Sequence, residues 1–326
     1  MSDAFSASSD LIDNGHGIYT IDAHYVAPRV ASIHLVLGDG GKSGEVAFFD
    51  TGTNLSWPYV AGALAHLGIA GEQVRYVIPS HVHLDHAGGA GLLMARFPNA
   101  QLVVHPRGAR HMIDPSKLFA ATIDVYGEAK ARRLYGDVTP VPAGRVIEAA
   151  DGMVLKLGAR VLTLLDTPGH ARHHVCLHDA QSGGVFTGDM FGLSYRQFDV
   201  DGRPSIIPTT TPTQFDPAAM RASIHRLLAL KPSAMYLTHF GKIADIERLG
   251  GDLLRQLEAH IKVALDAREV PAGARHARIR QGLEALFLAE AQQQGWPMPV
   301  PELLKWLEAD IDLNAQGLDF WLGSAP

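Results

Sequence analysis

The chain has 326 residues, of which 47% are hydrophobic and 19% are charged, and its formal net charge is −6 with the histidines neutral. A chain of this length buries a large core, and its single cysteine, Cys176, excludes a disulfide bond within the chain. The negative charge disfavours a general nucleic-acid-binding protein, because such proteins gain much of their affinity from basic side chains that neutralise phosphates.

The sequence shows no targeting or membrane-spanning pattern. A secretory signal typically has a basic cluster followed by an apolar run, and the first six residues show no such pattern. No apolar stretch approaches the roughly 18 residues that a membrane-spanning helix needs. We therefore expect a cytoplasmic protein that acts on a small-molecule substrate, with no nucleic-acid or membrane partner. Whether it forms a homodimer is left open.

The first 240 residues mix short apolar segments with helical ones. The apolar segments are separated by turn-forming residues, as is typical of strands. We predict strands over residues 18–21, 31–37, 45–49, 74–78, 101–105, 153–157, 161–165, 174–177, 185–187 and 235–238. We predict helices over residues 58–67, 91–96, 108–136 and 217–230, the last with Asp216 as N-cap and Pro217 in its first turn.

After residue 241 the pattern becomes helical. Residues 244–268, 276–293 and 300–309 read as amphipathic helices, because apolar residues recur in them at helical spacing. The change predicts an α/β catalytic domain over residues 1–241 and a helical C-terminal extension over residues 242–326.

The segment His81-Val82-His83-Leu84-Asp85-His86 directly follows the strand predicted over residues 74–78. Three imidazoles and a carboxylate within six residues suit a core poorly, because each would need a buried polar partner. They suit divalent metals well, since imidazole nitrogen and carboxylate oxygen are ligands for zinc, iron and manganese. A loop after a strand can also bring these side chains to one point. The segment therefore predicts a metal site.

His-x-His-x-Asp-His after a strand resembles the signature of the metallo-β-lactamase superfamily. Other motifs of that family follow in the same order along the chain: Asp50-Thr51-Gly52, Thr167-Pro168-Gly169-His170, Gly188-Asp189 and Thr238-His239. The resemblance covers residues 50–239 and implies an αββα sandwich with the metals at one edge.

The resemblance also implies a set of metal ligands. It assigns His81, His83 and His170 to a first metal. It assigns Asp85, His86 and His239 to a second, with Asp189 bridging the two. Each ion then keeps a position for water, which is typical of a catalytic site. We expect two zinc ions, with iron or manganese as alternatives, and no organic cofactor.

Several neighbouring residues receive weaker assignments. Asp50 is interpreted as orienting a ligand histidine, or as a turn aspartate bonded to its own backbone. In the family, glycine often precedes the histidine that corresponds to His174; here that position is His173, which we expect to be exposed. We expect His174 to support a neighbouring ligand or to be structural, and Cys176 to be buried and inert. The run of small residues 87–91 is interpreted as room for a helix to approach the metals.

The predicted chemistry is hydrolysis by a metal-bridging hydroxide. Asp85 would accept the water's proton, and Tyr195 would support an oxyanion. True β-lactamases of this fold typically carry cysteine or serine where this chain has Asp189, so the resemblance favours the glyoxalase II and lactonase-like branches. We expect cleavage of an ester, thioester or lactone. A phosphodiesterase and a non-catalytic metal-binding or ligand-sensing module are the alternatives.

Overall fold

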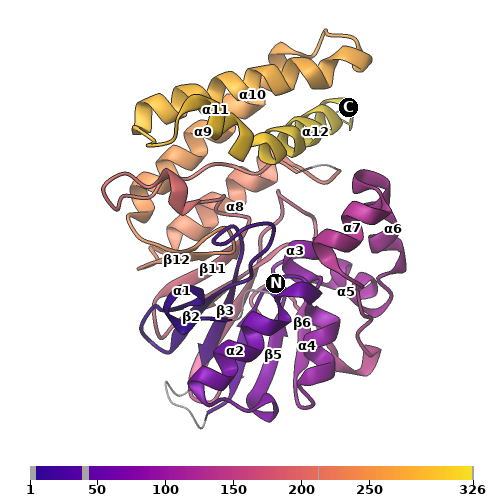
Figure 1. Cartoon of the computed structure of the whole chain (residues 1–326), viewed down its shortest axis with the longest axis vertical. Helices are drawn as coiled ribbons and strands as arrows, with labels where there is room; N and C mark the ends of the chain where they lie inside the picture. Colours follow the sequence, from indigo (N-terminus) through magenta and orange to yellow (C-terminus); the bar gives the residue numbers. More distant parts are fainter. Residues whose placement is uncertain (1–4, 39–43, 212, 325–326) are drawn as a thin grey trace. The chain divides into compact units, whose positions relative to one another are not determined.

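The structure is a computed structural model that describes residues 5–38, 44–211 and 213–324 (Figure 1). Residues 1–4, which belong to the segment that predicts the absence of a secretory signal, lie outside these ranges. Two compact units alternate along the chain. The first comprises Met1–Asp166, His173–Gly188 and Pro232–Ala244, and the second comprises Thr167–Arg172, Asp189–Lys231 and Asp245–Pro326.

The first unit contains two sheets. One has seven strands in the order β1 to β7, and the other has six in the order β13-β12-β11-β10-β9-β8. The first sheet is mixed, because β1 to β4 pair antiparallel and β4 to β7 pair parallel. Its strands are β1 (Leu11–Asp13), β2 (Ile18–Asp22), β3 (Ser32–Leu37), β4 (Val46–Phe49), β5 (Val74–Ile78), β6 (Gln101–Val104) and β7 (Val146–Glu148). The second sheet contains β8 (Val154–Leu157), β9 (Arg160–Asp166), β10 (Val175–Asp179), β11 (Gly184–Gly188), β12 (Met235–Leu237) and β13 (Gly241–Ile243).

Strand β4 shows why the central strands read as continuous apolar runs. Successive side chains of a strand point to opposite faces of its sheet. Phe48 packs with the helices that cover the outer face, whereas Phe49 packs with residues of the second sheet. Both rings are completely buried, and burying each contributes about 1.5–3 kcal/mol to folding. A strand with both faces covered needs no polar alternation.

Helices cover the outer face of the first sheet. Val60 and Leu64 of α2 pack on it together with Leu93 and Met94 of α4, and Figure 1 shows both helices in front of β5 and β6. The helices of this unit are α1 (Ala7–Asp10), α2 (Trp57–Leu67), α3 (Leu84–Ala87), α4 (Ala90–Arg96), α5 (Pro106–Ile113), α6 (Ser116–Tyr126) and α7 (Glu128–Tyr135). The helical turns η1 (Asn54–Ser56), η2 (Gly71–Gln73) and η3 (Ala143–Arg145) complete it.

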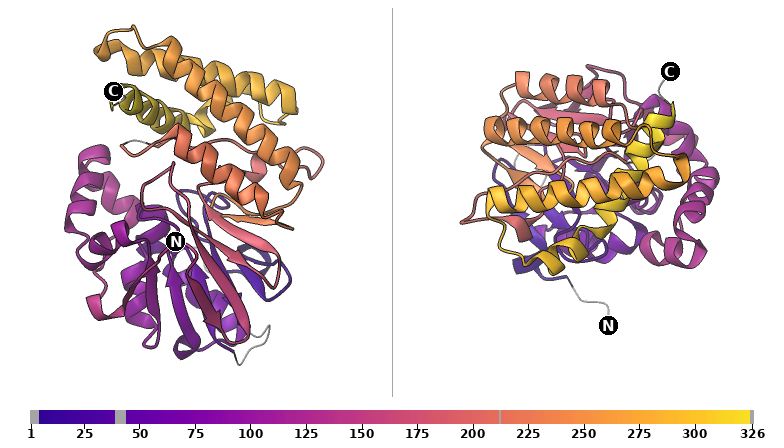
Figure 2. Two further views of the ribbon diagram at one scale, coloured as in Figure 1. Left: turned by 180° about the vertical axis from the view of Figure 1, so that it is seen from behind. Right: turned by 90° about the horizontal axis from the view of Figure 1, so that it is seen from above.

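The second unit is helical. It contains η4 (Arg196–Phe198), α8 (Pro217–Ala229), α9 (Ile246–Asp266), α10 (Ala272–Gln294), α11 (Val300–Trp306) and α12 (Glu308–Ser324), and Figure 2 gives two further views of these helices. Asp216 caps α8 as predicted, because its side chain accepts the backbone N–H of Ala219. On α9, Leu249, Leu253 and Leu257 recur every four residues and are completely buried, so this helix presents one apolar stripe to its neighbours.

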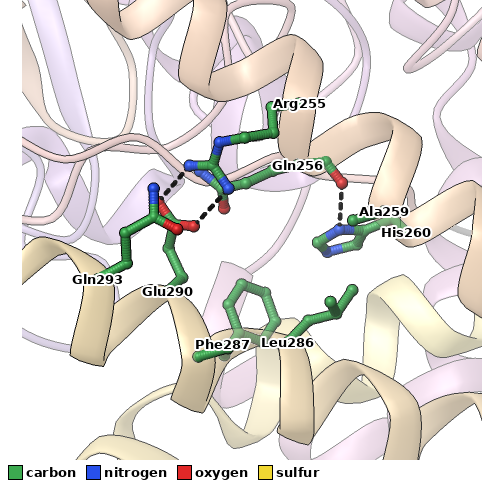
Figure 3. Close-up of a pocket in the computed structure, with 9 residues that line it drawn as sticks. Arg255, Gln256, Ala259, His260, Leu286, Phe287, Glu290 and Gln293 are labelled. Carbon is green, nitrogen blue, oxygen red and sulfur yellow. Dashed lines mark hydrogen bonds and ion pairs between the residues drawn. The ribbon is translucent and has the colours of Figure 1, made fainter.

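An ion pair and a ring contact join α9 to α10. Arg255 donates to both carboxylate oxygens of Glu290 at 2.8 Å each, and the Nδ1–H of His260 donates to the backbone carbonyl of Gln256 at 2.8 Å (Figure 3). His260 is 1% exposed and packs edge-on against Phe287. Its burial lowers the pKa of the imidazole to about 4.

The predicted fold class is confirmed, with two mixed sheets, flanking helices and a helical C-terminal region. The domain boundary predicted after residue 241 stays a prediction. In the structure, the helices α9 to α12 belong to a compact unit that also contains earlier segments of the chain. The helical character predicted for residues 108–136 is confirmed, and the structure divides this range among three helices, α5, α6 and α7. The sequence analysis also missed β1, β13 and most of α12. Across the ranges that the structure describes, no helix combines the length and apolar character needed to cross a membrane.

Candidate metal centre

Asp85, His86 and His239 converge in the first unit, although residues 86 and 239 are far apart in sequence. Asp85 and His86 lie on α3, directly after β5 and the loop that follows it, and His239 follows β12. The two Nε2 atoms lie 3.4 Å apart, and each lies 3.5 Å from Oδ2 of Asp85. Both imidazoles are at least 95% buried. These three side chains form one of the groups whose spacing fits a metal ion.

The tautomers of the two histidines follow from their other ring nitrogens. His86 donates its Nδ1–H to Oδ2 of Asp50 at 2.8 Å. His239 donates its Nδ1–H to the backbone carbonyl of Val30 at 2.7 Å. A neutral imidazole that donates from Nδ1 carries a lone pair on Nε2. Two nitrogen lone pairs and a carboxylate oxygen therefore face one another, which is the arrangement that a divalent cation requires.

Asp50 connects several parts of this centre. Its backbone adopts a left-handed conformation with φ of +59°, which aspartate tolerates better than most residues. Its carboxylate is completely buried and accepts the backbone N–H of Ser80 at 2.6 Å, the Ser80 hydroxyl at 3.1 Å and the hydroxyl of Thr238. Asp50 thus orients His86, and the alternative of a turn aspartate bonded to its own backbone is wrong.

His81 and His83 also lie together in the first unit. The Ser80 hydroxyl donates to Asp50, so its oxygen is left to accept the Nδ1–H of His81 at 3.0 Å. Nε2 of His81 lies 2.8 Å from Nδ1 of His83. Ser80 therefore links the orientation of His81 to the carboxylate that orients His86.

The second unit contains His170 and Asp189, which lie close to each other. Nε2 of His170 lies 3.4 Å from Oδ2 of Asp189. Nδ1 of His170 lies 3.4 Å from the backbone carbonyl of Thr209, and the hydroxyl of Thr211 lies 3.3 Å from Nε2. His170 is completely buried and Asp189 is 5% exposed. Each predicted ligand is thus placed beside at least one other ligand of its own unit.

The prediction that His173 is exposed is wrong, because its side chain is 5% exposed. Its ring lies edge-on to His83 with centroids 6.0 Å apart and parallel to His81 at 6.2 Å. Burial, together with the neighbouring His83, lowers the pKa of His173 to about 3, so the imidazole is neutral. His174 is completely buried and stacks on His81, as expected of a structural residue.

A pair of tyrosines, one of them within reach of the charge of Asp85, was missed by the sequence analysis. The hydroxyls of Tyr25 and Tyr135 share a hydrogen bond of 3.0 Å, although the residues are 110 positions apart. Tyr135 ends α7 and is 4% exposed. Burial raises the pKa of Tyr135, with smaller contributions from Tyr25 and from the charge of Asp85, so the phenol stays protonated near neutral pH.

Other predicted residues have mixed outcomes. The hydroxyl of Tyr195 donates to Asp310 at 3.2 Å, and its catalytic role stays a prediction. Cys176 is completely buried, as predicted. The role predicted for the small residues of segment 87–91 stays a prediction; a Cβ on Gly89 would lie 2.7 Å from the backbone oxygen of Thr51. They let α4 begin against the Asp50 turn.

A separate group, Asp10, Asp22 and His24, also has metal-compatible spacing. His24 lies 3.1 Å from Asp10, and both oxygens of Asp22 accept backbone N–H groups, from His24 and Arg29. These bonds explain the group as a connection between the N-terminal segment and the β2–β3 loop.

Comparisons with known proteins point to one family. The sequence profile described as "Metallo-beta-lactamase superfamily" matches residues 28–239. The crystal structure of an archaeal metallo-beta-lactamase superfamily protein from Sulfolobus tokodaii superposes with a TM-score of 0.62. It covers 93% of this chain and 98% of its own, at 22% identity, and this likeness shows the fold alone.

Two further relatives carry names that state an activity. An acyl-coenzyme A thioesterase of Gallus gallus is 30% identical over 187 residues, which is 54% of this chain and 63% of the relative. A hydroxyacylglutathione hydrolase of Maricaulis maris is 30% identical over 152 residues, 46% of this chain and 45% of the relative. This chain thus spans less than two thirds of either. The profile match, the fold and the histidine-rich centre agree, and the chain belongs to the metallo-beta-lactamase superfamily.

Proposed function

We propose that this protein is a dinuclear metal-dependent hydrolase that cleaves an ester, thioester or lactone of a small molecule. The observation that carries the proposal is the convergence of Nε2 of His86, Nε2 of His239 and Oδ2 of Asp85. Three electron-pair donors at this spacing repel one another without a cation between them, and imidazole with carboxylate is a ligand set that suits zinc.

We propose that the first ion is held by His81, His83 and His170, that the second is held by Asp85, His86 and His239, and that Asp189 contacts both. The hydrogen bonds that His86 donates to Asp50 and His239 donates to the Val30 carbonyl support the set, because they fix both ligands in the tautomer that binds metal. Zinc is the proposed metal, with iron or manganese as alternatives.

Bound divalent ions lower the pKa of a coordinated water and polarise a substrate oxygen. The chain's own residues supply the remaining chemistry. Asp85 has a side chain that is 21% exposed, so its carboxylate is available to take a proton as the nucleophile attacks. We propose that Tyr135, held protonated by burial and hydrogen-bonded to Tyr25, donates a hydrogen bond to an oxygen of the reacting group.

Thioester cleavage is the leading reaction. By their names, one relative is an acyl-coenzyme A thioesterase and the other hydrolyses hydroxyacylglutathione, and the acidic net charge disfavours polyanionic nucleic-acid substrates. Ester and lactone hydrolysis need the same attack on a carbonyl carbon and stay within the proposal. The predicted alternatives are a phosphodiesterase and a non-catalytic metal-binding module.

The test is a substrate panel run on zinc-loaded and chelator-treated protein. It contains an acyl-coenzyme A, an acylglutathione, an acyl lactone, a phosphodiester and a β-lactam. We expect chelator-sensitive cleavage of at least one carbonyl substrate, and its loss in His86→Gln with His225→Gln, an exposed histidine on α8, as the control. Cleavage of the phosphodiester alone would support the first alternative. Stoichiometric metal without any cleavage would support the second.

A further inference from the structure

The C-terminal helix α12 makes polar contacts with a segment far from it in sequence. Asn314 of α12 is 2% exposed. Its Oδ1 accepts the backbone N–H of Thr210 at 2.5 Å and lies 3.0 Å from the Thr210 hydroxyl. Its Nδ2 donates to the backbone carbonyl of Pro208 at 3.3 Å. One amide thus holds Pro208 and Thr210, which flank Thr209 in the segment 208–211, and both ends of the amide are used.

A glycine allows the helix to come this close. Gly317 lies one turn after Asn314 on α12, and a Cβ at this position would overlap the backbone oxygen of Thr210. Any other residue would push the helix and the segment 208–211 apart. Asn314 and Gly317 together therefore define the distance between α12 and this segment.

The same segment contacts a predicted metal ligand. The backbone carbonyl of Thr209 lies 3.4 Å from Nδ1 of His170, and the hydroxyl of Thr211 lies 3.4 Å from the same atom. A carbonyl can only accept, so its position beside Nδ1 favours the tautomer with the proton on Nδ1. The lone pair then sits on Nε2, the nitrogen that faces Asp189 at 3.4 Å.

We infer that α12 positions His170 for metal binding, through the bonds of Asn314 to the segment 208–211. Asn314 is a positioning residue, because it acts on His170 through Thr210 and its neighbours and touches neither metal nor substrate. The inference rests on the proposed function, since it assumes that His170 ligates one of the two ions. It gives the C-terminal region a role in holding the catalytic centre.

Zinc titration of the metal-free protein against a chromophoric chelator tests this inference. Wild-type protein is expected to bind two zinc ions, and His170→Gln identifies the binding step that depends on this ligand. We expect Asn314→Leu to weaken that step about tenfold or more and to leave the other step within a factor of about two, as for other groups that orient ligands. Asn314→Asp keeps the acceptor for Thr210 and should recover part of the loss.

The matched control is Gln316→Leu on the same helix. The Gln316 amide bonds to Asp312 within α12, so its loss should change neither binding step. If Asn314→Leu does not fold, Gly317→Ala tests the same contact and should weaken the same step. Nitrogen chemical shifts of His170 in the metal-free protein add a readout without metal. We expect them to show a proton on Nδ1 in the wild type and a mixture of tautomers in Asn314→Leu.

The outcomes separate the two claims. Wild-type protein that fails to bind two ions would contradict the proposed function itself. Suppose that the wild type binds two ions. If Asn314→Leu and Gly317→Ala then lose zinc affinity equally at both binding steps, or lose none, the inference is overturned and the proposed function stands.

Discussion

Replacing Asp50 by asparagine tests how the centre is organised. The carboxylate accepts four hydrogen bonds, from the Ser80 backbone and hydroxyl, from His86 and from Thr238. Asparagine offers one oxygen, and its NH₂ group must face at least one of these donors. The backbone adds no strain of its own, because asparagine tolerates a φ of +59° as well as aspartate does.

The magnitude follows from these bonds. A hydrogen bond to a charged group contributes about 1.5–3 kcal/mol, and the substitution removes the charge from all four bonds and at least one bond outright. We expect the free energy of unfolding of the metal-free protein to fall by about 3–5 kcal/mol. We also expect metal affinity to fall about 10–100-fold, because His86 loses the partner that fixes its tautomer.

Urea denaturation of the metal-free protein and zinc titration against a chelator measure the two effects separately. Asp216→Asn is a suitable control, since it exchanges the same groups at a helix N-cap that tolerates either residue. Unchanged zinc affinity in a folded Asp50→Asn protein would refute the orienting role of this carboxylate.

Three further predictions concern groups outside the ligand set. The pKa of His260 falls from 6.5 to about 4 on folding, so the unfolded chain binds more protons than the folded chain between these pH values. The free energy of unfolding should therefore drop by about 3 kcal/mol as the pH falls through this window. Urea denaturation of His260→Phe should show a shallower pH dependence. Arg160→Met leaves the completely buried Asp179 carboxylate without its guanidinium and should cost about 3–5 kcal/mol in the same assay, with a smaller loss if Asp179 is replaced as well. Tyr135→Phe should lower kcat/KM about tenfold at unchanged zinc content, whereas Tyr126→Phe on the neighbouring helix should leave it unchanged, and equal effects would contradict a direct role for the Tyr135 hydroxyl.

The local parts of the centre could be predicted from sequence. His81, His83, Asp85 and His86 fall within six residues after a recognisable strand, so their chemistry is visible without a fold. Assigning the distant ligands depended on family resemblance, since nothing in the local pattern around His239 distinguishes it from other histidines. Many of the strands were predictable because strands buried on both faces read as apolar runs, whereas their packing as two sheets was predicted from the family resemblance.

Features that depend on long-range packing could not be predicted. The segment that forms most of α12 contains weak helix formers, including Asn314 and Gly317, and its helix depends on tertiary contacts rather than on propensity. The burial of His173 depends on neighbours from other segments, such as Val82, whose backbone N–H lies 3.5 Å from Nδ1 of His173. The hydrogen bond from Tyr25 to a residue 110 positions away has no signal in either local sequence.

The most direct test of the dinuclear centre is a crystal structure of the zinc-loaded protein with anomalous diffraction measured at the zinc edge. We predict two anomalous peaks about 3.5–4 Å apart, one bonded to His81, His83 and His170 and the other to Asp85, His86 and His239. Peaks at other residues, or no peak beside His86 and His239 in protein that retains its fold, would contradict the account.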